Sequence, residues 1–113
     1  METQPKRHFM TEQQLQVQIF THHWNHYPEQ RKRLFHVNNK ARNAIEGKTF
    51  QMMGVVPGVS DLILIKPGAI LFIELKTDDG FQSADQKAFQ AIVESCGHTY
   101  KICRSLADFL QLL

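Results

Sequence analysis

The hydrophobic positions of this chain follow two periods, and the change from one to the other predicts its elements. After Thr11, apolar residues recur at the spacing of one helix face, and Thr11-Glu-Gln-Gln14 has the pattern of a capping box that opens a helix. Shorter runs rich in Ile, Leu, Val and Phe, bounded by Pro and Gly, are typical of strands. The pattern predicts helices over residues 11–24, 41–53, 83–96 and 105–113, and strands over residues 34–37, 61–65, 70–76 and 99–103.

The segment between the second and third predicted strands determines how they pair. Residues 66–69, Lys-Pro-Gly-Ala, are too few for a parallel crossover, so we expect an antiparallel hairpin. The element order α-β-α-β-β-α-β-α then predicts an α/β sandwich, a restriction-endonuclease-like fold with a small mixed sheet flanked by helices. The 113 residues suit one domain with one core. We expect a single domain over residues 1–113, with residues 1–9 as a flexible N-terminus.

Composition and charge narrow the classes of protein to consider. No apolar stretch approaches the roughly 20 residues of a membrane helix, and the polar N-terminus lacks the apolar core of a signal peptide. Two cysteines make no disulfide framework, so we expect free thiols in a cytoplasmic protein without a membrane partner. Residues 1–50 contain eight Lys and Arg against four Glu, whereas residues 51–113 contain five against seven acidic residues. This asymmetry hints at a polyanion on one side and cation ligands on the other.

Three charged residues around the predicted hairpin suggest chemistry. Glu74 and Lys76 are two apart on one strand, so their side chains share a face, and the hairpin brings Asp61 towards them. Two converging carboxylates suit Mg²⁺, which binds through few protein oxygens and keeps sites for water and phosphate. The Leu75 carbonyl could add a ligand, and Lys76 could orient the attacking water in phosphodiester hydrolysis. From the spacing alone, a surface salt bridge between Glu74 and Lys76 on an edge strand is the open alternative.

A longer series of motifs carries a resemblance to a known family. GVVPGVSD at residues 54–61 is followed by FIELK at residues 72–76 and by SADQ at residues 83–86, where a helix begins. This ordered series resembles the VRR-NUC family, the virus-type replication-repair nuclease domain of the PD-(D/E)xK superfamily, over roughly residues 10–113. The chain departs from the family in one respect, because Ser60 stands where the family usually has a proline.

The resemblance implies a role for individual residues. Asp61 and Glu74 match the metal ligands of the family, and Lys76 matches its catalytic lysine. Glu12 matches a further acidic ligand from the first helix, and Gln86 matches a glutamine that assists the site. Both have ordinary alternatives, since acidic and polar side chains are common in the first turn of a helix.

The function expected from these features is that of a Mg²⁺-dependent DNA endonuclease in which Mn²⁺ substitutes, without a small-molecule cofactor. A non-catalytic nucleic-acid-binding or assembly module with the same fold is the alternative. No base-reading module is visible, so we expect selectivity for DNA structure. We expect the phosphate contacts to include the basic residues of the N-terminal half, namely Arg31, Lys32, Arg33, Lys40 and Arg42.

The same resemblance carries expectations about assembly and source. Small stand-alone members of the family resemble dimeric nucleases of four-way (Holliday) junctions, which act in DNA repair and occur in phages and prophages. We therefore expect a homodimer in the cytoplasm of a bacterial or phage-infected cell. Its contact would be apolar surface around Phe20 and Trp24 or around Phe109 and Leu113, unless these residues complete the core of the monomer.

Overall fold

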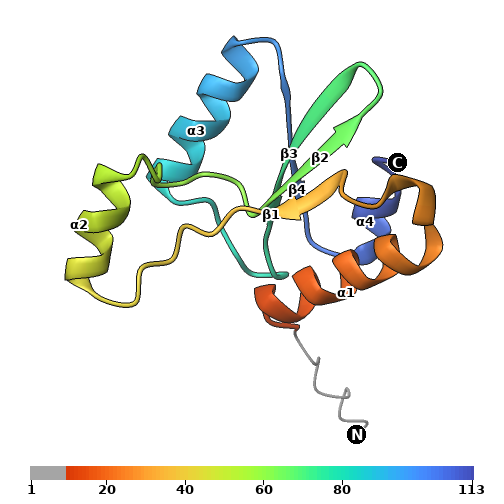
Figure 1. The fold of residues 1–113 in the computed structure, drawn as a ribbon, viewed down its shortest axis with the longest axis horizontal. Helices are drawn as coiled ribbons and strands as arrows, with labels where there is room; N and C mark the ends of the chain where they lie inside the picture. Colours follow the sequence, from red (N-terminus) through yellow and green to blue (C-terminus); the bar gives the residue numbers. More distant parts are fainter. Residues whose placement is uncertain (1–9) are drawn as a thin grey trace, which may run out of the picture.

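The computed structural model describes residues 10–113, so the expected flexible segment 1–9 lies outside the described residues. The sheet has the order β1-β2-β3-β4, in which only the β3–β4 pair is parallel (Figure 1). The expected mixed α/β fold and its element order are confirmed. The elements are α1 (Glu12–His26), η1 (Pro28–Gln30), β1 (Leu34–His36), α2 (Ala44–Met52), β2 (Leu62–Lys66), β3 (Ala69–Leu75), α3 (Ala84–Ser95), β4 (Thr99–Cys103) and α4 (Leu106–Leu110).

Side-chain caps and one tight turn explain where the elements begin and end. The hydroxyls of Thr11 and Ser83 accept bonds from backbone nitrogens in the first turns of α1 and α3, as the predicted capping box at Thr11 requires. The predicted start of the second helix at residue 41 is wrong. α2 begins at Ala44, because the Asn43 side chain caps it. The hairpin register places Lys66 opposite Ala69, and Gly68 takes the positive φ of +74° that this turn requires.

Other boundaries differ from the predicted ranges by one to three residues, most at the ends of α1 and α4. α1 continues two residues past Trp24 and ends beside Tyr27, where the Tyr27-Pro28 pair predicts an end because a residue before proline leaves the helical region. α4 ends at Leu110 instead of Leu113, because its last residues form a turn in which the Leu112 nitrogen bonds to the Phe109 carbonyl. The two cysteines are free, as expected. No helix within residues 10–113 is long and apolar enough to cross a membrane.

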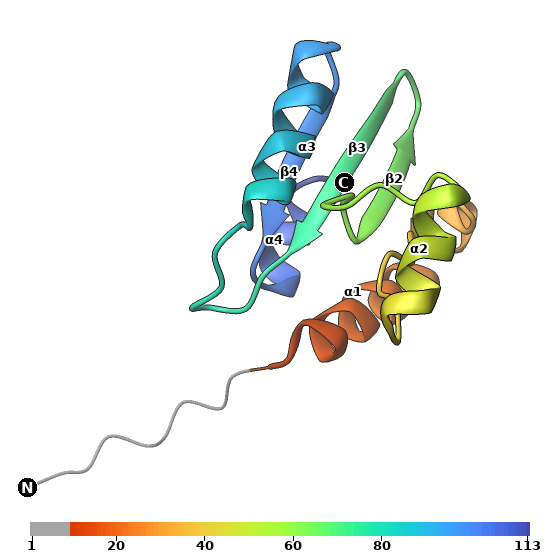
Figure 2. The ribbon, with the colours of Figure 1, turned by 90° about the vertical axis from the view of Figure 1, so that its left-hand side faces the viewer.

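The core lies on one face of the sheet, between the strands and the helices α1 and α4 (Figures 1 and 2). α1 contributes two buried residues at helical spacing, Leu15 and Ile19. α4 contributes Phe109, which is fully buried and so offers no surface for a dimer contact, while Leu113 is half-buried. The strands supply Leu34, Leu62, Leu64, Leu71, Ile73, Leu75 and Cys103.

The other face of the sheet carries the expected second set of β3 side chains. Phe72 packs edge-to-face on Phe89 of α3, with ring centroids 5.7 Å apart, and Phe89 in turn contacts Tyr100. Glu74 follows Phe72 on this face, because alternate side chains of a strand point the same way. The predicted division of β3 into a core face and a charged face is therefore confirmed.

Candidate active site

Asp61 lies at the open end of the hairpin and is held there by three backbone contacts. Its Oδ2 accepts a hydrogen bond of 2.7 Å from the Leu75 nitrogen, which joins the start of β2 to the end of β3. Its carbonyl oxygen accepts a bond of 2.9 Å from the Val37 nitrogen and lies 2.8 Å from Nδ1 of His36. The carboxylate of Asp61 therefore has a defined position beside the last residues of β3.

One carboxyl oxygen of Glu74 is hydrogen-bonded, and the other has no hydrogen-bond partner among residues 10–113. The side chain is 1% exposed, and Oε1 accepts a bond of 3.0 Å from Nε2 of Gln86. Oε2 is buried and has no hydrogen-bond partner among residues 10–113. Burial raises the pKa of Glu74 to about 9, and the nearby Asp61 carboxyl adds to this. A buried oxygen without a partner fits a cation that the fold would bind between the two carboxyls.

Lys76 is enclosed by the loop that follows β3. The side chain is 7% exposed, and a Cβ at Gly80 would lie 3.2 Å from its Cδ. Nη1 of Arg104 holds this loop closed by donating to the carbonyl oxygens of Thr77 and Gly80, at 2.8 and 3.0 Å. The positive charge of Lys76 lowers the pKa of Glu74 and so opposes the effect of burial.

The alternative of a surface salt bridge between Glu74 and Lys76 is excluded. β3 pairs with β2 on one side and with β4 on the other, so it is a central strand. Both side chains are buried. Within residues 10–113, the single ion pair joins Arg42 to Glu46.

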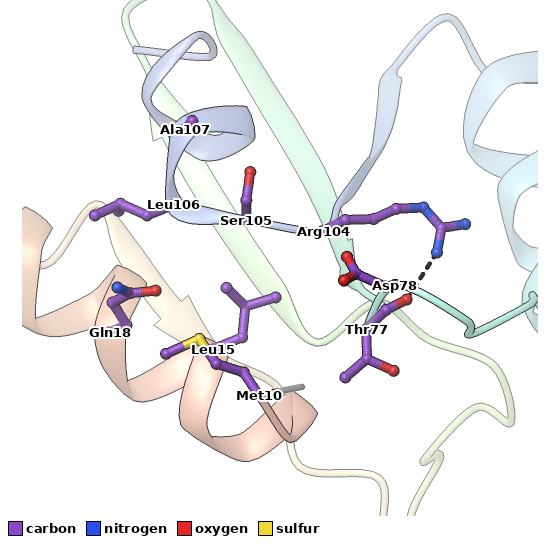
Figure 3. A pocket seen from close by; sticks show the side chains of 9 residues that line it. All are labelled: Met10, Leu15, Gln18, Thr77, Asp78, Arg104, Ser105, Leu106 and Ala107. Atoms are coloured by element: carbon purple, nitrogen blue, oxygen red, sulfur yellow. Dashed lines mark hydrogen bonds between the residues drawn. The ribbon is translucent and has the colours of Figure 1, made fainter. Parts of the chain in front are cut away.

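The loop held by Arg104 also borders a pocket of about 360 Å³ (Figure 3). Its walls come from the start of α1, the loop after β3 and the start of α4. Figure 3 shows Arg104 at one side of the pocket, bonded to the Thr77 carbonyl. Its lining residues are Met10, Leu15, Gln18, Thr77, Asp78, Arg104, Ser105, Leu106 and Ala107. None of the carboxylates expected to bind metal lines this pocket, so we assign it a structural role in positioning the loop.

A second cavity, of about 220 Å³, lies in front of Asp61. It is lined by Glu12, Gln13 and Gln16 of α1, together with His36, Lys40, Asp61 and Leu75. Glu12 therefore shares a cavity with Asp61, as the resemblance implies. No group of three or more His, Cys, Asp or Glu residues in the described part of the chain is close enough to hold a metal together. This geometry leaves Asp61, Glu74 and the Leu75 carbonyl as candidate direct ligands, with Glu12 across the cavity.

His36 is a residue of the cavity to which the sequence pattern assigns no role, because no nucleophile pairs with it in the sequence. It lies 25 positions before Asp61, on a short strand whose neighbours carry no recognisable motif. Its location follows from the antiparallel pairing of β1 with β2, which places His36 opposite Leu62, directly after Asp61. Only that long-range pairing could have identified it.

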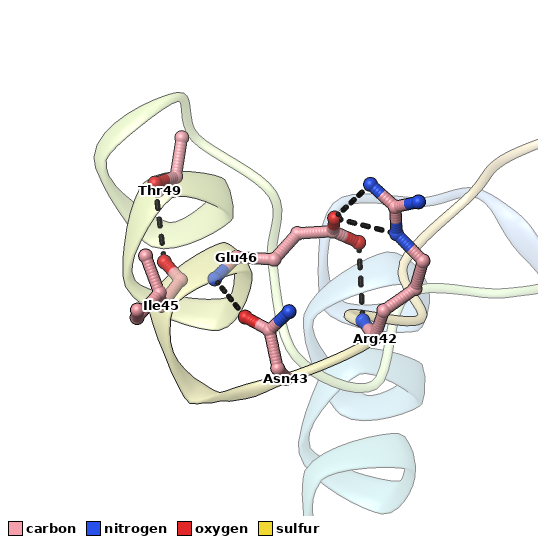
Figure 4. A network of polar contacts seen from close by, with 5 residues as sticks. All are labelled: Arg42, Asn43, Ile45, Glu46 and Thr49. Carbon is pink, nitrogen blue, oxygen red and sulfur yellow. Dashed lines mark hydrogen bonds and ion pairs between the residues drawn. The ribbon is translucent and has the colours of Figure 1, made fainter.

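The five basic residues expected to contact phosphate do not form one patch. Lys40 lines the cavity of Asp61 and Glu12. Arg42 is engaged by Glu46, since both its Nε and its Nη2 lie 2.8 Å from Oε2 (Figure 4). Lys32 lines a neighbouring groove, while Arg33 is half-buried. Arg31 packs its guanidinium over the Trp24 ring.

The GVVPGVSD segment reaches the site through a close backbone contact. Gly58 has a φ of +82°, and a Cβ there would collide with the backbone of Asp85 and lie 2.7 Å from the Gln86 nitrogen. The glycine thus allows the loop to pack on the first turn of α3, where Gln86 holds Glu74. Ser60, in the position of the family proline, is fully buried and donates a bond of 3.3 Å to the Leu62 carbonyl.

We expect Gly58→Ala to lower the free energy of unfolding by about 2–4 kcal/mol, because backbone strain and overpacking add. Gly54→Ala is the matched control, since Gly54 also has a positive φ of +89° but has no atom within 4 Å of the added Cβ. That control should lose about 1–2 kcal/mol from strain alone. Chemical denaturation measures both variants, and equal losses would show that the contact with α3 is loose.

The fold and the carboxylates at the end of the hairpin define a class of protein: a small α/β domain with a charged set at one end of a mixed sheet. Among solved structures, this fold is similar to one described as a "VRR_NUC domain protein", with a TM-score of 0.73. The match covers 91% of this chain and 84% of the other, at 19% sequence identity. At that identity the likeness concerns the fold, and for the fold the expected resemblance is confirmed. No protein-family model matches the sequence, and no curated protein matches it.

Proposed function

We propose that this protein is a divalent-metal-dependent endonuclease that hydrolyses phosphodiester bonds of DNA. The observation that carries the proposal is the buried, unpartnered Oε2 of Glu74, placed beside Asp61 at the end of a central strand. Without a cation the buried carboxyl group stays protonated, and a cation bound beside Oε2 would let it ionise. Oxygen ligands with room for water favour Mg²⁺, for which Mn²⁺ would substitute.

Each residue of the site has a role in this proposal. Asp61, Glu74 and the Leu75 carbonyl bind the metal, and Gln86 orients Glu74 through its bond to Oε1. Glu12 acts across the cavity through water. The bound ion would polarise the phosphate and lower the pKa of a coordinated water. Lys76, with its stem enclosed by the Gly80 loop, presents its ammonium to the water or to the charge that develops on phosphorus.

The alternative of a non-catalytic binding module finds less support. Such a module has no need for a buried carboxyl group, whose desolvation is costly. The chain contains all four expected residues, Asp61, Glu74, Lys76 and Gln86. Glu74 bonds to Gln86 and lies near Asp61, which in turn bonds to the Leu75 nitrogen. This arrangement favours a catalytic site.

A cleavage assay tests the proposal. The purified protein is incubated with end-labelled linear duplex, flap and four-way DNA in Mg²⁺, in Mn²⁺ and in EDTA. Cleavage in both metals and none in EDTA would support the nuclease. Binding of DNA without cleavage of any substrate in either metal would favour the non-catalytic module.

We further propose that two copies act together on branched DNA, through α2. One domain has one site and cuts one strand, whereas a two-fold pair would cut opposing strands of a four-way junction. α2 buries none of its residues and projects from the body of the protein (Figure 2). Its surface includes Ile45 and Met52, which are 81% and 83% exposed. Unpaired apolar surface on a projecting helix is typical of a protein–protein contact.

Sedimentation tests the dimer. We expect a species of twice 13.1 kDa at micromolar concentration, which the double variant Ile45→Glu/Met52→Glu converts to monomer by placing charges in the contact. Ile92→Glu, at an exposed apolar position of α3, is the matched control and should remain dimeric. A monomer in the unaltered protein, with and without DNA, would contradict the proposal.

A further inference from the structure

An apolar groove of about 430 Å³ lies beside the cavity of the candidate site. Its walls are the exposed side of α1 and the edge strand β1, and its residues include Val17, Phe20, Trp24, Lys32 and Phe35. Gln16 and His36 line both the groove and the cavity that contains Asp61. The groove is therefore a direct continuation of the site along α1, over roughly 12 Å from Gln16 to Trp24 at the rise of a helix.

Two of the rings in this groove, those of Phe20 and Trp24, are held in position by contacts. Phe20 stacks on Trp24, with centroids 5.9 Å apart and planes inclined by 27°. The Arg31 guanidinium lies 4.6 Å from the centre of the Trp24 ring, and its Nε donates to the Trp24 carbonyl at 3.0 Å. About two-fifths of each of Phe20, Trp24 and Phe35 remains exposed. Partly exposed aromatic rings beside cations are the arrangement on which unpaired bases stack.

We infer that this groove binds one or two unpaired nucleotides of the DNA strand whose phosphate enters the metal site. The bases stack on Phe20, Trp24 and Phe35, while Lys32 and Arg31 attract the phosphates. This inference rests on the proposed function and adds that its substrates include DNA that has unpaired nucleotides next to the scissile bond, such as flaps and splayed ends.

Charge argues against a second copy of the chain in this groove. A two-fold contact places a surface against itself, so it would bring Lys32 and Arg31 of one copy close to the same residues of the other. Like charges in such a contact are unfavourable, whereas a polyanionic strand matches them. The exposed residues Ile45 and Met52 of α2 carry no charge, so a two-fold contact through them does not bring their own like charges together. We therefore assign the dimer to that helix.

Trp24 makes the groove directly observable, because it is the only tryptophan of the chain. Its fluorescence is followed while oligothymidylate, or a blunt duplex of equal length, is added in the presence of Ca²⁺. We expect the single strand to quench the emission and the blunt duplex to leave it largely unchanged. An emission that does not respond to the single strand would overturn the inference.

Affinity measurements on variants complete the test. Phe35→Ala should weaken oligothymidylate binding roughly 5- to 100-fold, the range measured for loss of one stacking ring, while Phe35→Tyr should preserve it. Ile92→Ala, an exposed apolar position on α3, is the control, and unfolding midpoints confirm that each variant is folded. Equal binding by Phe35→Ala and the unaltered protein would contradict the inference.

Two further outcomes separate this inference from the proposals that precede it. If oligothymidylate quenches Trp24 but no DNA is cleaved in Mg²⁺ or Mn²⁺, the groove is confirmed and the nuclease proposal fails. If Phe35→Ala instead converts a dimer to a monomer in the absence of DNA, the groove is a contact between copies and the inference fails.

Discussion

Asp61→Asn and Glu74→Gln should each lower the rate of DNA cleavage in Mg²⁺ by at least about 100-fold, the loss expected when a main electrostatic stabiliser is removed. Both substitutions keep the size of the side chain and remove its charge. The amide oxygen of the introduced asparagine can still accept the bond from the Leu75 nitrogen, and that of the introduced glutamine can still accept the bond from Gln86. The loss would therefore report on metal binding and not on a displaced hairpin.

Lys76→Met should lower cleavage to a similar extent without weakening the metal. It replaces the ammonium with an apolar group of similar length, which suits the enclosed stem beside Gly80. Because a positive charge near the carboxylates opposes the binding of a cation, Mn²⁺ affinity should stay the same or rise.

Two measurements distinguish these roles. Single-turnover cleavage gives the rate of the chemical step, and titration with Mn²⁺ gives the affinity for metal. Lys101→Met, on the exposed side of β4, is the matched control and should leave both unchanged. Cleavage by Lys76→Met at the unaltered rate would refute the role given to the lysine, and unchanged Mn²⁺ affinity in Glu74→Gln would refute the ligand set.

In EDTA, Glu74→Gln should make the protein more stable, by about 2–5 kcal/mol at pH 8. Glu74 is 1% exposed and its Oε2 is without a partner among residues 10–113. A glutamine amide in the same place needs no ionisation and can donate to the nearby Asp61 carboxylate. Glu74→Gln should therefore abolish cleavage and at the same time stabilise the metal-free protein.

The pH dependence of this effect follows from the raised pKa of Glu74. The carboxyl group ionises near pH 4.5 in the unfolded chain and near pH 9 in the folded protein. Between these values the unfolded chain has released a proton that the folded protein retains, so the free energy of unfolding falls as the pH rises. The slope is at most about 1.4 kcal/mol per pH unit. Below pH 4.5 Glu74 is protonated in both the folded and the unfolded chain, so Glu74→Gln should not gain stability in this way.

Thermal unfolding in EDTA from pH 4 to pH 9 checks this prediction. The difference in midpoint between Glu74→Gln and the unaltered protein should grow with pH, and adding Mg²⁺ should stabilise only the unaltered protein, because a ligand that binds the native state raises its stability. Midpoints that stay parallel over the whole range would show that Glu74 is ionised in the metal-free fold.

Local sequence patterns were sufficient for the elements and for the orientation of the charged strand. Thr11 and Ser83 identified two helix starts, because a capping side chain needs only its own first turn. The short turn around Gly68 required an antiparallel hairpin, and the alternation along β3 placed Glu74 opposite the core side chains. These features depend on neighbours a few positions apart.

The tertiary structure decided which of those residues are buried and which meet. The parallel pairing of β4 makes β3 a central strand, and this pairing buries Glu74 and Lys76, which the spacing alone also allowed on an exposed edge. The pairing of β1 brings His36 to Asp61, and the packing of α4 buries Phe109 while α1 leaves Trp24 exposed. Each outcome depends on contacts between segments far apart in the chain, and local periodicity contains no information about which segments become neighbours.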